Sequence, residues 1–141
     1  DGYMRLARTI METSRAIIDG INAVPGLRVL GDPPMSVFCF GSDTADIYAV
    51  GDELDRLGWH PDRQQMPPSL HLMVTPAHAD VVEPFLADLR RAAAGVATGA
   101  PALGGSAAMY GMLGTVADRS IVRNVIMDFI GGLTKVEEEP E

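Results

Sequence analysis

Tyr110 is the residue whose type and setting best suit the binding of a ligand. It lies in the stretch GGSAAMYGML, where small neighbours leave space for a phenol to project. A tyrosine hydroxyl can donate a hydrogen bond to a phosphate or carboxylate oxygen. The alternative is a tyrosine packed beneath the last predicted helix, and the residues alone leave both interpretations open.

Three histidines, His60, His71 and His78, could in principle supply imidazole ligands to a metal ion. Prolines separate the first from the second, and the third stands at the start of a predicted helix. The spacing therefore does not predict a metal site, and His71 is equally explained as a partly buried, hydrogen-bonded side chain.

Nucleophilic and acid–base chemistry finds little support in the remaining residues. Cys39 lies among apolar residues on a predicted strand without a nearby base, so we interpret it as a small core residue. Lys135 is the single lysine and stands close to the acidic C-terminal end. We expect a group of acidic residues to serve as helix caps and a solvated helix face. These are Asp43, Asp46, Asp52, Glu53 and Asp55.

The composition is that of one folded domain that does not bind nucleic acid. The chain has 141 residues, is 47% hydrophobic and carries a formal net charge of -8, which opposes binding to a phosphate backbone or an anionic membrane. No apolar run approaches the roughly 20 residues that cross a bilayer. A single cysteine suits a reducing compartment, so we expect a cytoplasmic location. Because the chain lacks an initiator methionine, we expect a segment of a longer protein.

The elements that position these residues follow from hydrophobic periodicity. Apolar residues from Leu6 to Ile21 predict an amphipathic helix that ends near Pro25, and two short strands follow, Leu27 to Leu30 and Ser36 to Phe40. A second helix should begin at Asp43 or Thr44 and end with Gly58.

The stretch from Gly58 to His78 organises the second half of the chain. Its prolines exclude a regular helix or a central strand before Leu70, and alternating residues predict a strand from Leu70 to Thr75. Thr75 should then cap a third helix with Pro76 in its first turn. The order α-β-β-α-β-α predicts an α+β fold, a short sheet with helices packed on one face.

The C-terminal part is predicted to contain one more helix after a loop over residues 98–105. Its apolar residues are expected to face inward. These are Ile121, Val122, Val125, Ile126, Phe129 and Ile130. We expect residues 1–133 to form one domain and residues 134–141 an acidic tail.

Three blocks of the sequence resemble a known family. They are GLRVLGDPPMSVFCFGS, DIYAVGDELDRLGWHPDRQQMPPSLHLMVTPAH and SAAMYGMLGTVADR. From about Tyr3 to Phe129 the chain resembles the C-terminal portion of the sphingosine-1-phosphate lyases, a group II decarboxylase-like branch of the fold type I pyridoxal-phosphate enzymes. The first two blocks are shared more loosely with amino-acid decarboxylases, and the YGM block points to the lyase branch.

The resemblance implies a small domain that closes the active site of a homodimeric lyase. Such an enzyme holds pyridoxal 5'-phosphate in a large domain and cleaves a phosphorylated sphingoid base to a long-chain aldehyde and phosphoethanolamine. The resemblance also implies that Tyr110 lies at the substrate phosphate. The motif with the cofactor-binding lysine is absent, and Lys135 does not match it. We therefore assign no catalytic, cofactor-binding or metal-binding residue here and expect the segment alone to be inactive.

Two other functions stay open on the sequence. The first is the small domain of a pyridoxal-phosphate-dependent amino-acid decarboxylase, which needs no site for a substrate phosphate. The second is a non-catalytic module that binds a ligand or a partner, an interpretation that the missing lysine favours.

Overall fold

The computed structural model describes residues 1–98, 107, 109–111 and 119–133. Helix α1 spans Gly2–Asn22, as its apolar spacing predicts. Ile17 and Ile21 are buried at its C-terminal end, whereas Tyr3, Met4 and Leu6 are exposed at its beginning. The buried residues of this helix therefore lie in its C-terminal half, from Thr13 onward.

Four antiparallel strands form one sheet in the order β1-β2-β4-β3. They are β1 (Leu27–Val29), β2 (Val37–Ser42), β3 (Asp62–Gln64) and β4 (Ser69–Met73). The sequence predicts three of them and misses β3. Because it is only three residues long and lies between prolines, β3 can pair only at the sheet edge and gives no periodic signal.

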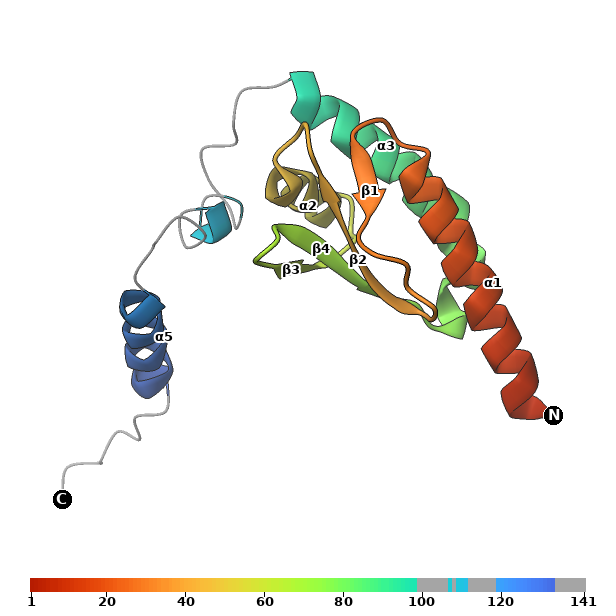
Figure 1. The fold of residues 1–141 in the computed structure, drawn as a ribbon, viewed down its shortest axis with the longest axis horizontal. Helices are drawn as coiled ribbons and strands as arrows, with labels where there is room; N and C mark the ends of the chain where they lie inside the picture. Colours follow the sequence, from red (N-terminus) through yellow and green to blue (C-terminus); the bar gives the residue numbers. More distant parts are fainter. Residues whose placement is uncertain (99–106, 108, 112–118, 134–141) are drawn as a thin grey trace.

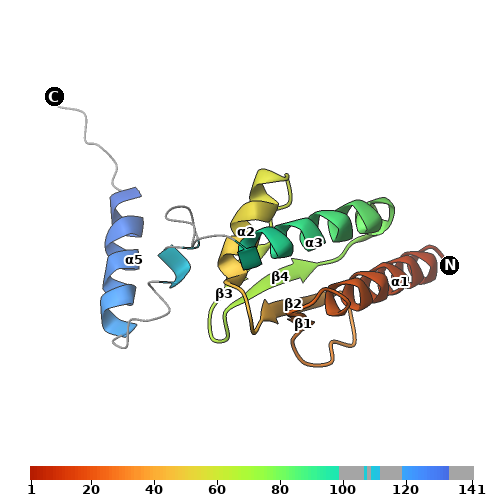
Figure 2. The same cartoon turned by 90° about the horizontal axis from the view of Figure 1, so that it is seen from above.

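Helices α1, α2 and α3 cover one face of this sheet, which confirms the predicted architecture (Figures 1 and 2). Phe38, Phe40 and Leu70 point into this covered face and are buried. Cys39 alternates with the two phenylalanines and is only partly buried, so its interpretation as a core residue is wrong. A strand sends successive side chains to opposite faces, and Cys39 lies on the face opposite to that of the two phenylalanines.

Helix α2 spans Ile47–Arg56 and is capped by Asp46 rather than by Asp43 or Thr44. The Asp46 carboxylate accepts hydrogen bonds from the backbone N–H groups of Tyr48 and Ala49. Gly58 follows the helix with φ +89°, the left-handed conformation expected after a helix end. The predicted C-terminal boundary of α2 is therefore confirmed and its predicted N-cap is corrected.

Thr75 begins the next helical segment, as predicted. A 3-10 helix, η1 (Pro76–Val81), leads directly into α3 (Val82–Thr98), whose Phe85, Leu86 and Leu89 are buried. Helices α1 and α3 approach closely at Gly20, where an added Cβ would overlap the side chain of Leu86. A larger residue at position 20 would therefore require the Leu86 side chain or the helices to shift.

The last helix, α5, spans Arg119–Leu133 and corrects one expectation. Four of its apolar residues that were expected to face inward are exposed. These are Ile121, Val125, Ile126 and Ile130. The predicted loop at residues 98–105, apart from Thr98, and the predicted tail at 134–141 lie outside the described residues. Within the described parts of the chain, no helix is both long and apolar enough to cross a membrane.

Candidate functional site

Tyr110 is half-buried and packs against the hydrophobic core. Residues 107 and 109–111 have helical conformation. The Tyr110 ring centroid lies 5.5 Å from that of Tyr48 on α2, with 38° between the ring planes. Its backbone carbonyl accepts a hydrogen bond from Nε2 of Gln65 at 3.2 Å. The structure thus places Tyr110 beside α2 and the residues that follow β3.

The Tyr48 ring, which contacts the Tyr110 ring, is held in a fixed orientation. Its hydroxyl donates a hydrogen bond of 2.6 Å to the backbone carbonyl of Gln64, and its side chain is buried. Burial raises the pKa of the Tyr48 phenol, and the charge of Asp46 and the neighbouring Tyr110 act in the same direction. The phenol therefore stays protonated at neutral pH, so its hydrogen bond and ring orientation are retained.

A buried ion pair lies on the same side of α2. Nη2 of Arg63 on β3 is 2.6 Å from an oxygen of Asp52 and 2.6 Å from an oxygen of Asp55. The second oxygen of Asp52 accepts a hydrogen bond from the backbone N–H of Ala107 at 3.0 Å. The acidic neighbours of Asp52 suggest a solvated helix face, and this expectation is wrong for Asp52. Its carboxylate instead links α2, β3 and the turn that carries Tyr110.

Arg63 keeps its charge despite its burial. Burial acts to lower the pKa of its guanidinium, but hydrogen bonds and charge attraction from Asp55 and Asp52 outweigh burial, so the pKa is raised overall. Its Nε is buried without a hydrogen-bond partner within the described part of the chain. A permanently charged, planar donor group thus binds the buried carboxylate of Asp52 and the partly exposed carboxylate of Asp55.

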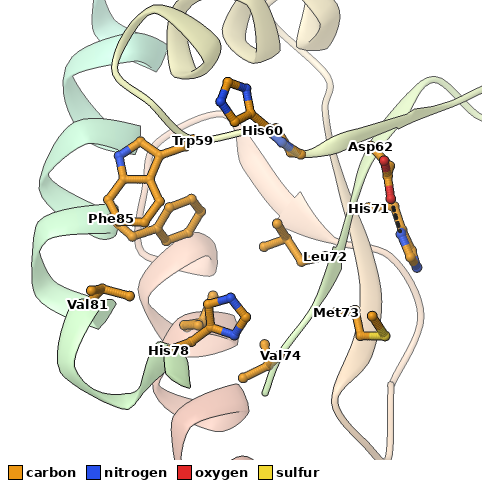
Figure 3. A pocket seen from close by; sticks show the side chains of 12 residues that line it. Trp59, His60, Asp62, His71, Leu72, Met73, Val74, His78, Val81 and Phe85 are labelled. Carbon is orange, nitrogen blue, oxygen red and sulfur yellow. Dashed lines mark ion pairs between the residues drawn. The ribbon is translucent and has the colours of Figure 1, made fainter. Parts of the chain in front are cut away.

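A cavity of about 280 Å³ is lined in part by the Trp59–Asp62 connection (Figure 3). The Trp59 and Phe85 rings meet edge to face in its wall, with centroids 5.3 Å apart. The Trp59 indole N–H donates a hydrogen bond of 2.8 Å to Asp88, which fixes the indole. Apolar walls with a few polar groups are typical of small-ligand sites. Tyr110 does not line this cavity, so the two regions are separate candidates.

All three histidines contribute to the wall of this cavity, which their sequence spacing does not predict. Nδ1 of His78 accepts a hydrogen bond from the Thr75 backbone N–H at 2.8 Å, so its proton is on Nε2 when the ring is neutral. Nδ1 of His60 lies 2.9 Å from Asp55. Within the described residues, no three His, Cys, Asp or Glu side chains are arranged to hold a metal ion.

The residues that the structure describes do not fit the attachment of a pyridoxal cofactor. Covalent attachment needs a lysine amine. The chain has one lysine, Lys135, which lies outside the described residues. We therefore assign no step of cofactor chemistry to these residues. Their available chemistry is hydrogen bonding and orientation by Tyr110 and the groups that hold it.

Comparison with curated proteins identifies a consistent set of relatives, although no protein-family model matches the sequence. The chain is 43% identical to a sphingosine-1-phosphate lyase of Oryza sativa over 131 residues, which is 92% of this chain and 24% of the relative. It is 35% identical to the sphingosine-1-phosphate lyase of Drosophila melanogaster over 134 residues, with the same two coverages. The chain thus spans about a quarter of the length of these relatives.

Solved structures agree with this relationship. A sphingosine-1-phosphate lyase of Burkholderia pseudomallei matches with a TM-score of 0.74 and 29% identity, over 95% of this chain and 26% of that one. A glutamate decarboxylase of Lactobacillus brevis matches with a TM-score of 0.64 and 17% identity, over 71% of this chain and 26% of that one. The second likeness shows a shared fold alone. This chain is therefore similar to the sphingosine-1-phosphate lyases across nearly all of its own length and about one quarter of theirs.

Proposed function

We propose that this chain is the small C-terminal domain of a pyridoxal-phosphate-dependent carbon–carbon lyase. The substrate is a phosphorylated sphingoid base, cleaved to a long-chain aldehyde and phosphoethanolamine. The observation that carries the proposal is the 43% identity to a sphingosine-1-phosphate lyase across 92% of the chain. The domain comprises residues 1–133, followed by an acidic tail at 134–141.

In this proposal Tyr110 binds the substrate phosphate, and the domain helps to close the active site. A phenol donates a hydrogen bond to a phosphate oxygen without carrying a charge of its own. Its support is the fixed setting of the residue, because Tyr48 contacts the ring and Gln65 binds the carbonyl. The cofactor, which supplies an electron sink when bound, is held by the large domain of the same protein.

The exposed apolar side chains support a larger assembly. Tyr3 and Met4 of α1 are 90% and 69% exposed, and Val125 of α5 is 60% exposed. Exposed apolar side chains that gather on an element mark surfaces that meet another protein surface. We propose that the large domain and a second subunit of a homodimer cover them. A cytoplasmic location is consistent with the lone Cys39.

Substitution of Tyr110 in the longer protein tests the function and separates it from its rivals. Tyr110→Phe removes one donor from the phosphate site, so KM for the phosphorylated substrate should rise by about 5- to 150-fold, the equivalent of about 1–3 kcal/mol. Inorganic phosphate should also inhibit the variant less strongly. An unchanged KM and an unchanged inhibition by phosphate would refute the role of Tyr110.

Two rival functions predict different results for the longer protein. An amino-acid decarboxylase would release carbon dioxide from an amino acid. Because it has no site for a substrate phosphate, Tyr110→Phe should not change its KM through the loss of a phosphate contact. Its support is the shared fold with glutamate decarboxylase, at only 17% identity. A non-catalytic module would show neither visible cofactor absorbance nor lyase turnover. The mass and absorbance spectrum of the purified protein distinguish that case directly.

A further inference from the structure

Asp52 connects the buried ion pair to the segment that carries Tyr110. One of its oxygens lies 2.6 Å from Nη2 of Arg63, and the other accepts a hydrogen bond from the backbone N–H of Ala107 at 3.0 Å. That second bond is buried and joins positions 55 residues apart in sequence. It is a charge-assisted contact, the stronger class of hydrogen bond. The contact ties the Tyr110 segment to α2.

Neutralising Arg63 does not by itself require Asp52. Asp55 also lies 2.6 Å from the same Nη2 and is a second carboxylate for one guanidinium. The three side chains therefore carry one surplus negative charge. A buried carboxylate is stabilised by additional donors, and the Ala107 N–H is such a donor. The arrangement thus gives Asp52 a function that Asp55 lacks.

The Ala107 amide and Tyr110 lie close together in the same helical turn. Both residues have helical conformation, and residues three apart lie on the same side of a helical turn. Ala107 is buried, so the turn is fixed at one end by Asp52. At Tyr110 itself the contacts are a ring contact with Tyr48 and a hydrogen bond from Gln65 to its carbonyl. Release of Ala107 is therefore expected to loosen the N-terminal end of the turn, while the Tyr48 and Gln65 contacts remain.

We infer that Asp52 is a positioning residue that holds the Ala107 turn and thereby directs the Tyr110 phenol toward the substrate phosphate. The inference rests on the proposed phosphate-binding role of Tyr110. Asp52 itself touches neither substrate nor cofactor in this scheme. Its effect on substrate affinity passes through the geometry of the turn.

Amide hydrogen exchange of the full chain tests the positioning directly. Asp52→Ala should accelerate exchange at Ala107 by about tenfold or more, equivalent to about 1.4 kcal/mol or more. Asp55→Ala is the matched control, because it removes a carboxylate from the same Nη2 but has no contact with Ala107. Its Ala107 amide should exchange at close to the wild-type rate. Equal exchange rates in all three proteins would overturn the inference.

Asp52→Asn keeps the test decisive if Asp52→Ala fails to fold. The amide retains one acceptor oxygen of the same shape but no charge, so protection of Ala107 should be intermediate. Protection that is fully retained in Asp52→Asn, together with normal folding, would show that the charge of Asp52 is not needed and would overturn the charge-assisted anchor.

Kinetics in the longer protein then separate the anchor from the proposed function. Asp52→Ala should raise KM for the phosphorylated substrate about tenfold and weaken inhibition by inorganic phosphate, with a much smaller change in kcat. Adding Tyr110→Phe to Asp52→Ala should raise KM little further, because both act on one interaction. Faster exchange at Ala107 with unchanged KM would overturn the directing role of Asp52 if Tyr110→Phe still raises KM. If Tyr110→Phe also leaves KM unchanged, the proposed role of Tyr110 fails instead. Slow exchange in every variant refutes the anchor whatever KM does.

Discussion

Helices α3 and α5 have similar amphipathic sequences but opposite surroundings. Phe85, Leu86 and Leu89 of α3 are buried against the sheet and α1, whereas Val125 and Ile126 of α5 are exposed. A helical hydrophobic pattern specifies which side chains require cover. It does not specify where that cover comes from. Relatives about four times as long as this chain contain additional surface that can provide it.

The largest expected effect of a substitution is in the buried face of α3. Leu89 is fully buried, so Leu89→Ala should lower the free energy of unfolding by about 2–5 kcal/mol. The matched change in α5, Ile126→Ala, should cost less than about 0.5 kcal/mol in this chain. Urea denaturation of both variants measures the difference. Equal losses would mean that the α5 face is covered as well.

A second test concerns the polar side of α3. Asp88 accepts the indole N–H of Trp59, so Asp88→Ala should destabilise the fold by about 1–3 kcal/mol and shift the emission of Trp59, the single tryptophan. Arg91→Ala is the control, because Arg91 binds the same carboxylate from an exposed position. Fluorescence-detected unfolding compares them. A blue shift or loss in the control alone would contradict the assignment.

Tyr48 of α2 tests whether the helix-covered side of the sheet depends on buried hydrogen bonds as well as apolar contact. Tyr48→Phe should cost about 0.5–1.5 kcal/mol, because the Gln64 carbonyl loses its donor. The pKa of the Tyr48 phenol is raised in the folded state, so its contribution is complete below the ordinary value of 10.0 and is lost as pH rises through the folded value. Denaturation between pH 8 and 12, approximately the range of tyrosine titration, should show a shallower decline for Tyr48→Phe.

The smallest effect is expected at the exposed pair of Arg28 and Asp43, which resembles α5 in its access to water. A hydrogen bond and charge attraction from Arg28 lower the pKa of the Asp43 carboxyl. Any contribution is present above the ordinary pKa and is lost as pH falls through the lowered one. Water screens such pairs, so Arg28→Gln should leave the melting temperature unchanged at neutral pH. A clear decrease would show that the pair is not freely solvated.

The sequence predicts the parts of the fold whose signals are local. The periodicity of α1 and α3, the alternation along β4 and the Thr75 cap lie within short windows. The role of Asp52 was missed because its partners are 11 and 55 residues away in sequence. Among neighbouring acidic residues, nothing in the local pattern distinguishes the one that becomes buried.

The candidate site was predictable only in part. Tyr110 stands out through its small neighbours and through the family resemblance, but its contact with Tyr48 depends on tertiary packing. The meeting of His60, His71 and His78 at one cavity likewise depends on how the connection folds across β4. The exposure of α5 could not be inferred, because periodicity carries no information about surfaces beyond the segment itself.

Helix α1 crosses α3 at Gly20, near its C-terminal end, so most of the helix extends away from that crossing. A side chain at Gly20 would overlap that of Leu86, so either Leu86 or the helix crossing would have to shift. From Gly20 to its first residue, Gly2, the helix α1 extends about 27 Å. A small tilt of α1 at this crossing therefore produces a larger displacement of Tyr3 and Met4 at its other end. The absence of a side chain at Gly20 thus allows the close crossing from which the exposed end of α1 projects.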